Sequence, residues 1–177
     1  GSILAAGSTL LPEGNITLTA KWGRPVTVSF APNGGSGTME AMDVYAGDPF
    51  IVPGCGIEPP EGQRFVSWLI EGGESCYPDD GLVLQTDTTL IAQWKTPVMV
   101  GFAVANEYGD AEVYDMRDIF AEDGFVLPEC EYPAPEGMAF SHWIIQGGDG
   151  TRYDANTEVA LSAGEVVFVA QWRDASF

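Results

Sequence analysis

The sequence has few basic residues and only one histidine. Lys and Arg together number 7 against 26 Asp and Glu, which gives a formal net charge of −19. Nucleic acids and anionic membrane surfaces are bound through Lys and Arg side chains that neutralise phosphates, so neither is expected as a partner. The sequence around the histidine, His142 in FSHWII, shows no arrangement of nucleophile, base and orienting group. The sequence therefore does not predict catalysis by this residue.

Long hydrophobic runs are also missing. No stretch of about 18 apolar residues occurs, so membrane insertion is not predicted. A secretory signal peptide is not recognisable either, but the opening Gly-Ser is typical of a cloning scar, so the lack of a targeting signal is not informative. With 45% hydrophobic and 11% aromatic residues, the chain is nevertheless able to form folded cores and differs from a disordered acidic tail.

Cysteine is scarce as well, at Cys55, Cys76 and Cys130. No CxxC pair and no histidine-rich partner set accompany them, so neither a zinc site nor another cofactor site is predicted. An odd number of cysteines is compatible with one internal disulfide and one free thiol. It is equally compatible with three partly buried thiols. The candidate bridge, Cys55–Cys76, would stabilise its part of the chain by about 2–4 kcal/mol.

The sequence is rich in internal repetition. NITLTAKW, DTTLIAQW and EVVFVAQW end at Trp22, Trp94 and Trp172. FIVPGCGIEPPEGQRFVSW aligns without a gap to FVLPECEYPAPEGMAFSHW at an offset of 75 residues. We therefore divide the chain into a C-terminal fragment of a preceding repeat (1–23), a first complete module (24–96) and a second, divergent module (97–177).

The local patterns of both modules indicate β structure. VTVSF (26–30) alternates apolar and polar residues, and PNGGSG (32–37) has the Asn-Gly chemistry of a tight turn. Frequent prolines leave little room for long helices, and VYDMRDIFAED (113–123) is the best candidate for a short one. The predicted fold is mainly β, with tandem β-grasp-like modules that each contain a small twisted sheet and at most one short helix.

The repeated ending reads as a closing strand. In TLIAQW the period of two places Leu90, Ala92 and Trp94 on one face, and Ile91 and Gln93 on the other. Alanine leaves space beside the large indole. The pattern predicts that this tryptophan closes the hydrophobic core of its module, with a partly exposed ligand platform as the alternative.

These residues resemble a known family, the Listeria–Bacteroides repeat, which includes the B-repeat of internalin B. The match consists of VTVSFAPNGGSGTM at the start of the first module, FVSW in its middle and DTTLIAQW at its end. The second module lacks the Asn-Gly-Gly opening and carries insertions after Phe102 and Gly148. The resemblance implies small β-grasp-like modules repeated in tandem on secreted or wall-attached bacterial proteins. It also implies spacing or adhesion and no shared catalytic residues.

Several acidic turns have compositions that are compatible with a catalytic or calcium-binding site. Asp79 with Asp80, and Asp149 with Asp154, have the composition of glycosidase carboxylate pairs, but so small a module seldom provides the cleft. The same turns lack the twelve-residue pattern of a calcium loop. With 26 acidic residues, acids close in sequence are expected by chance. Solvated turns are the better interpretation.

Five tyrosines lie near turn signals, where side chains that stack on sugars or contact proteins tend to appear: Tyr45, Tyr77, Tyr108, Tyr132 and Tyr153. Two functions are compatible with the sequence. The first is a stalk or adhesion segment of an extracellular or cell-surface bacterial protein, with adjacent repeats of the same chain in contact. The second is a specific binding module, in which loops of residues 97–177 recognise a host or matrix protein or a glycan. The 15 acids of this range, against three Arg, favour a basic partner and salt-sensitive binding.

Overall fold

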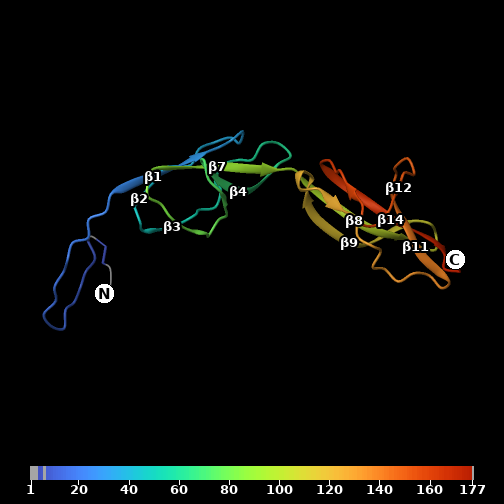
Figure 1. Ribbon diagram of the computed structural model, residues 1–177, viewed down its shortest axis with the longest axis horizontal. Coiled ribbons are helices and arrows are strands. Elements are labelled where there is room, and N and C mark those ends of the chain that lie inside the picture. Colours follow the sequence, from blue (N-terminus) through green and yellow to red (C-terminus); the bar gives the residue numbers. More distant parts are fainter. Residues whose placement is uncertain (1–3, 6, 177) are drawn as a thin grey trace.

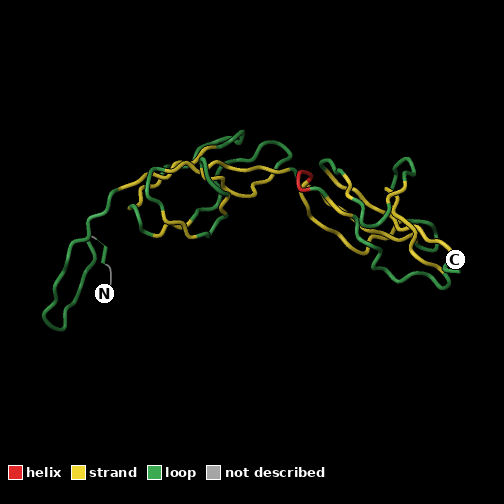
Figure 2. The backbone as a smooth tube through the Cα atoms, in the orientation of Figure 1, coloured by secondary structure: helices red, strands yellow, loops and turns green. Residues whose placement is uncertain are grey.

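The computed structural model describes residues 4, 5 and 7–176, and shows two β repeats arranged end to end, each with a five-stranded and a two-stranded sheet (Figure 1). Figure 2 shows that the chain consists almost entirely of strands and loops, with one helical turn between the two sheets. The predicted mainly β fold is confirmed, whereas the β-grasp-like arrangement stays a prediction. In the described part of the chain no helix is long and apolar enough to cross a membrane.

The first repeat contains a five-stranded sheet and a two-stranded one. The larger sheet has the order β2-β1-β7-β4-β5 and the smaller pairs β3 with β6. Only β1 and β7 run parallel, and the remaining neighbours are antiparallel. The strands are β1 (Pro25–Ala31), β2 (Met42–Tyr45), β3 (Pro49–Ile51), β4 (Arg64–Ile70), β5 (Ser75–Cys76), β6 (Gly81–Val83) and β7 (Thr88–Lys95).

The second repeat has the same topology. Its larger sheet has the order β12-β11-β14-β8-β9, and β10 pairs with β13. The parallel pair is again formed by the first and last strands, β8 and β14. The elements are β8 (Pro97–Ala105), β9 (Ala111–Phe120), η1 (Ala121–Asp123), β10 (Phe125–Val126), β11 (Met138–Ile145), β12 (Arg152–Tyr153), β13 (Glu158–Val159) and β14 (Gly164–Asp174).

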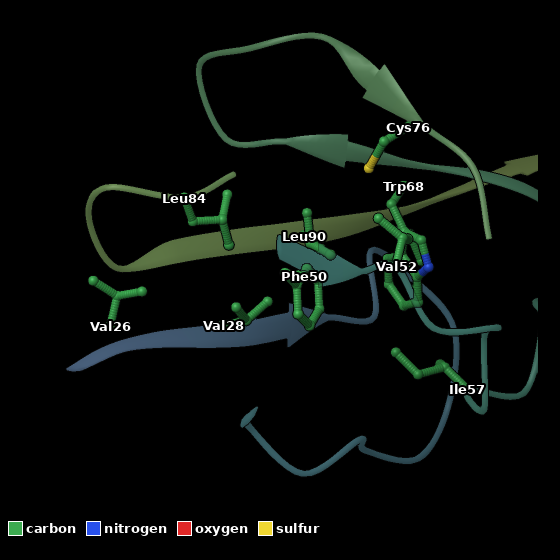
Figure 3. Packing of buried hydrophobic residues seen from close by; sticks show 10 residues of the cluster. Val26, Val28, Phe50, Val52, Ile57, Trp68, Cys76, Leu84 and Leu90 are labelled. Carbon is green, nitrogen blue, oxygen red and sulfur yellow. The ribbon is translucent and has the colours of Figure 1, made fainter. Parts of the chain in front are cut away.

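Each repeat has its own hydrophobic core, and the two clusters share no residue. In the first repeat the core lies between the five-stranded sheet and the β3–β6 ribbon (Figure 3). Trp68 is fully buried at its centre, and its Nε1 donates to the Pro53 carbonyl at 3.0 Å. Trp143 is equally buried, and its Nε1 donates to Pro128 at 2.9 Å. The buried indole thus finds a partner for its polar atom in both repeats.

The repeated closing strand behaves as predicted over most of its length. Leu90 and Ala92 of β7 are fully buried. Trp94 is half-buried at the edge of the core, 5.8 Å from the Phe65 ring in an edge-on arrangement. Its Nε1 donates to the Pro32 carbonyl at 2.9 Å. The side chains alternate between core and outer face because the strand period is two.

The fragment before the first repeat forms no strand in its described residues, 4, 5 and 7–23. The remainder of this predicted repeat fragment, residues 1–3 and 6, lies outside the described residues. Leu18 is 72% and Trp22 is 92% exposed, whereas the corresponding side chains of β7 pack against neighbouring strands. A closing strand therefore buries its apolar face only when the rest of a repeat is present to cover it.

The helix predicted at 113–123 is wrong. These residues form most of β9, which pairs with β8 from Pro97↔Phe120 to Ala105↔Ala111, and only Ala121–Asp123 turn helically. Tyr114 is the extra residue of a β-bulge within this pairing. A weak local helical pattern is outweighed here by a full row of hydrogen bonds to a buried strand, because tertiary context overrides local propensity.

Candidate functional site

The tyrosines predicted as ligand contacts do not gather at one site. Tyr77 (54% exposed) lies in the first repeat, and Tyr108 (82%) and Tyr132 (42%) lie in the second. Tyr153 of β12 is half-buried, with its ring 5.7 Å from Phe168 in an edge-on contact. No aromatic contact joins any two of these four rings in the described chain. They do not form a shared stacking platform.

Tyr108 projects because of the turn that carries it. The Asn106 side-chain oxygen accepts hydrogen bonds from the backbone N–H groups of Tyr108 and Asp110, each at 2.9 Å. Gly109 takes a positive φ of 84°, which the turn requires and which glycine adopts without a steric penalty. The turn between β8 and β9 is thus ordered by its own hydrogen bonds, with the phenol ring directed into solvent.

All three cysteines are free thiols in the structure. Cys76 is 3% exposed, and burial, together with the nearby charge of Asp80, raises the pKa of its thiol. Burial also raises the pKa of Cys55, against the opposing effect of a backbone hydrogen bond at Ile57. Cys130 lies 3.6 Å from the Tyr114 hydroxyl. A Cys55–Cys76 bridge stays a prediction for the oxidised protein.

We expect iodoacetamide to alkylate Cys76 at neutral pH at least about tenfold more slowly in the folded protein than in urea, because the reactive thiolate is both scarce and covered. Peptide mapping by mass spectrometry measures the rate at each cysteine. Equal rates in both conditions would contradict the buried position. The same digest of unreduced, unfolded protein distinguishes three thiols from one thiol and a disulfide.

The acidic residues considered as catalytic pairs are engaged in turns. Asp80 accepts from the Tyr77 N–H at 2.7 Å, and Asp149 accepts from the Thr151 N–H at 2.9 Å. Asp154 pairs with Arg152 at 3.1 Å. Within residues 4, 5 and 7–176, no group of three or more His, Cys, Asp or Glu side chains is placed to hold a metal ion. The hydrogen bonds of these carboxylates are those of turn-stabilising groups.

His142 lies half-buried on the outer side of β11, opposite Gln171 of β14. Its Nδ1 lies 3.0 Å from the hydroxyl of Ser141, the bulge residue that precedes it. Desolvation and the positive charge of Arg152 lower the pKa of the imidazole, against the opposing effect of Asp154. The ring is therefore held neutral at physiological pH.

Charged side chains of both repeats meet at their junction. Thr96 alone separates β7 from β8. The Arg64 guanidinium contacts the Asp118 carboxylate at 2.6 Å, and Lys95 pairs with Asp123. The Lys95 ammonium also lies 5.8 Å from the centre of the Phe120 ring. Each contact joins a residue of the first repeat to one of the second.

The helical turn η1 completes this junction. The Thr96 N–H donates to both carboxylate oxygens of Glu122 at 3.0 Å, and the Thr96 carbonyl accepts from the Ala121 N–H at 2.9 Å. Desolvation would raise the pKa of Glu122, but the hydrogen bonds from Thr96 and the charge of Lys95 outweigh it and lower the pKa. The linking residue is thus bound by the second repeat through both of its backbone polar groups.

A further surface is the outer face of the second sheet, on the side away from the β10–β13 ribbon. We define it by five residues on this side of β8, β9 and β14: Met99, Gly101, Val113, Met116 and Val167. A Cβ on Gly101 would lie 3.2 Å from Val167, 3.3 Å from Met116 and 3.6 Å from Val113. Met99, Val113 and Met116 are 37%, 44% and 44% exposed. This apolar outer face was not among the predicted sites.

The sequence does contain a signal for this face. The aligned first repeat places Thr27, Ser29 and Thr89 where the second has Met99, Gly101 and Val167. In the first repeat the Thr27 hydroxyl donates to Asp43 at 2.8 Å, so this side of the sheet is polar. The outward-facing residues of this side of the sheet are therefore polar in the first repeat and apolar in the second.

The first repeat matches a known family. The sequence model described as the Listeria-Bacteroides repeat domain matches residues 27–93. No curated protein matches the chain. Among solved structures, the chain is similar to the crystal structure of Mub-RV, with 12% identity and a TM-score of 0.19 over 83% of this chain and 98% of that one. The family match is confined to the first repeat, and the second shares its sheet topology.

Proposed function

We propose, from the match of residues 27–93 to the Listeria-Bacteroides repeat domain, that the chain is a non-catalytic spacer and adhesion segment of a secreted or cell-surface bacterial protein. Two copies of one topology follow each other along the chain. Repetition of a building block sets length and spacing, whereas an active site needs a single arrangement of unlike groups.

The junction is the observation that carries the spacer function. The linker between the two larger sheets is the single residue Thr96, and both of its backbone polar groups are hydrogen-bonded. Ion pairs between the repeats flank it, and the two sheets lie end to end (Figure 1). Each ion pair is exposed and stabilises little alone. Together with the bound linker they restrict rotation, so the repeats space a distal domain at a defined length instead of acting as beads on a flexible chain.

Glu122→Gln is expected to destabilise the second repeat by less than about 1 kcal/mol at neutral pH, since the site is exposed and solvent screens it. The pKa of Glu122 is lowered in the folded chain, so its contribution is present above the ordinary value of 4.5 and is lost as the pH falls through the lower folded pKa. Urea unfolding of both proteins across pH 2–7 measures this difference.

Glu136→Gln is the matched control, because Glu136 is exposed in a loop of the same repeat and should change stability little at any pH. A difference between the wild type and Glu122→Gln that persists unchanged at pH 2 would contradict the role of the carboxylate.

The adhesive part of the proposal is supported by the charge of the second repeat. Residues 97–177 carry 15 of the 26 acidic residues and only three arginines. A basic surface of a host or matrix protein would complement this charge. As a second function we propose that the loops of this repeat recognise a specific host protein or glycan. Tyr108 is the most exposed of the candidate contact residues.

A binding screen tests the adhesive role. The whole chain is titrated with immobilised matrix proteins, mucins and a glycan array at low and at high salt. Saturable binding that salt abolishes supports an acidic adhesive surface, since exposed charges are screened within about 8 Å at physiological ionic strength. Binding that survives salt and is lost in Tyr108→Ala supports stacking on the exposed ring. If the chain binds none of these partners, the adhesive role is contradicted and the spacer role stands.

A further inference from the structure

The outer face of the second sheet has the composition of a binding surface. Its two methionines and two valines are apolar, and Met99, Val113 and Met116 each keep more than a third of their surface in water. Ala103 and Val169 continue the same side of β8 and β14 and are 0% and 8% exposed, yet they lie outside the core cluster of the repeat. An exposed apolar patch that continues into buried apolar residues of the same face is a feature of interaction sites.

A hollow continues this face toward the far end of the sheet. It has a volume of about 500 Å³. Its floor is apolar, with Ala105, Ile144 and Val169 on neighbouring strands, and its walls are the turn that contains Gly109 and the turn that contains Gly147. The glycines add no side chains to the walls, and the volume of the hollow is sufficient for an aliphatic side chain of a partner.

The charges around this face select the partner. Glu165 lies beside Met99 across the β8–β14 pair, and Asp110 borders the hollow. Asp118 lies beside Met99 across the β8–β9 pair, but it is already paired with Arg64. Arg152, which pairs with Ile144 of β11, is neutralised by Asp154. Arg173 lies near the opposite end of β14. Acidic groups therefore border both the apolar patch and the hollow.

We propose that the outer face of the second sheet binds a cationic segment of another protein, in which lysine or arginine side chains flank aliphatic ones. The aliphatic groups cover Met99, Met116 and Val167 and enter the hollow, while the cations meet Glu165 and Asp110. A second copy of this chain is disfavoured as the occupant because each copy carries a net charge of −19. A glycan is disfavoured because no aromatic ring lies among the described residues that line the hollow.

This inference rests on the proposal that the second repeat is adhesive, and not on the rigidity of the junction. It differs from recognition by the Tyr108 ring, since the proposed apolar contacts lie on the strands and the β8–β9 turn contributes only the Asp110 carboxylate at the edge of the hollow. The first repeat serves as an internal reference, because it has the same topology with Thr27, Ser29 and Thr89 at the equivalent positions.

The test uses the whole chain and three peptides of equal length. One alternates lysine with leucine, the second lysine with serine, and the third glutamate with leucine. Binding is followed by two-dimensional NMR of the labelled protein. We expect saturable binding of the Lys-Leu peptide with shifts centred on Met99, Met116 and Val167, at least about tenfold weaker binding of the Lys-Ser peptide, and none of the Glu-Leu peptide.

The matched variant is the double substitution Met99→Thr with Val167→Thr. Both positions are threonine in the first repeat, and threonine suits a half-exposed strand, so the fold is retained. We expect this variant to bind the Lys-Leu peptide at least about tenfold more weakly. Val83→Thr, at a 61% exposed position of the first repeat, should bind like the wild type.

Several outcomes would overturn the inference. These are equal binding of the Lys-Leu and Lys-Ser peptides, shifts centred on another surface, undiminished binding by the double variant, or no binding at millimolar peptide. Concentration-dependent self-association that the double variant abolishes would assign the face to a second copy. If the matrix and mucin screen is positive while the double variant binds normally there, the adhesive function stands and the face is not its surface.

Discussion

Trp143→Ala is expected to destabilise the second repeat by about 3–5 kcal/mol and to leave the first repeat folded. Trp143 is 0% exposed, with its ring 5.1 Å from Phe102 and 5.0 Å from Phe140. Truncation leaves a cavity among these rings and also removes the donor that satisfies the Pro128 carbonyl. The loss is comparable with the whole stability of many small domains.

The effect should remain local because the two cores share no residue and meet only through the exposed junction. Amide NMR spectra provide the measurement. The signals of residues 97–176 should collapse to the narrow range of an unfolded chain, while those of the first repeat stay dispersed. Trp68→Ala should have the opposite effect: the first repeat unfolds and the second repeat stays folded.

Trp22→Ala is the matched control, since this indole is 92% exposed and its removal leaves no cavity. It should change the melting temperature of either repeat by no more than about 1–2 °C. Loss of both sets of signals in Trp143→Ala would contradict independent cores. Retention of the folded spectrum with little change in stability would contradict the central position of Trp143.

Gly35→Ala is expected to destabilise the first repeat by about 1–3 kcal/mol. A Cβ at this position would lie 2.7 Å from the Glu58 carbonyl oxygen, 2.7 Å from Trp94 and 2.9 Å from Ile57. The neighbouring Gly34 and Asn33 take φ values of 95° and 47°, so the turn has no freedom to move the added methyl outward. The indole of Trp94 must shift and weaken its hydrogen bond.

Gly54→Ala provides the comparison, because no atom lies within 4 Å of a Cβ at that glycine. Its stability should equal that of the wild type or rise slightly, as alanine restricts the unfolded chain. Urea unfolding of the two variants gives the difference. Equal stabilities would mean that Trp94 does not pack against the Asn-Gly-Gly turn, whose role in the first repeat would then be limited to chain reversal.

Sequence patterns predicted the closing strands of the two complete repeats and the tight turn, since both depend on local chemistry, whereas NITLTAKW forms no strand. The period of two in TLIAQW fixes which side chains face the core, and the turn forms at Asn33 and Gly34 as expected. The central core residues were harder to rank. Trp68 and Trp143 lie deeper than the repeated Trp94 and Trp172. This ranking depends on how the short strands of each ribbon pair, for example β3 with β6, and a local pattern does not show that pairing.

The junction and the outer face depend on long-range pairing. Glu122 and Asp123 reach the linker only because β9 is a long strand that returns alongside β8, and a helix was predicted there. The apolar outer face lies on alternate residues of separate strands, so its members become neighbours only once the register is known. Alignment of the two repeats already contains the change from Thr27 to Met99, which gains meaning when both are placed on one side of the sheet.

Residual dipolar couplings of the whole chain in a weakly aligning medium test the central claim most directly. If the junction holds the repeats as a spacer of defined geometry, one alignment tensor will fit the couplings of residues 25–95 and 97–176 together. Two tensors that differ in magnitude would show that the repeats reorient independently about Thr96, and that the chain is a flexible linker instead of a spacer.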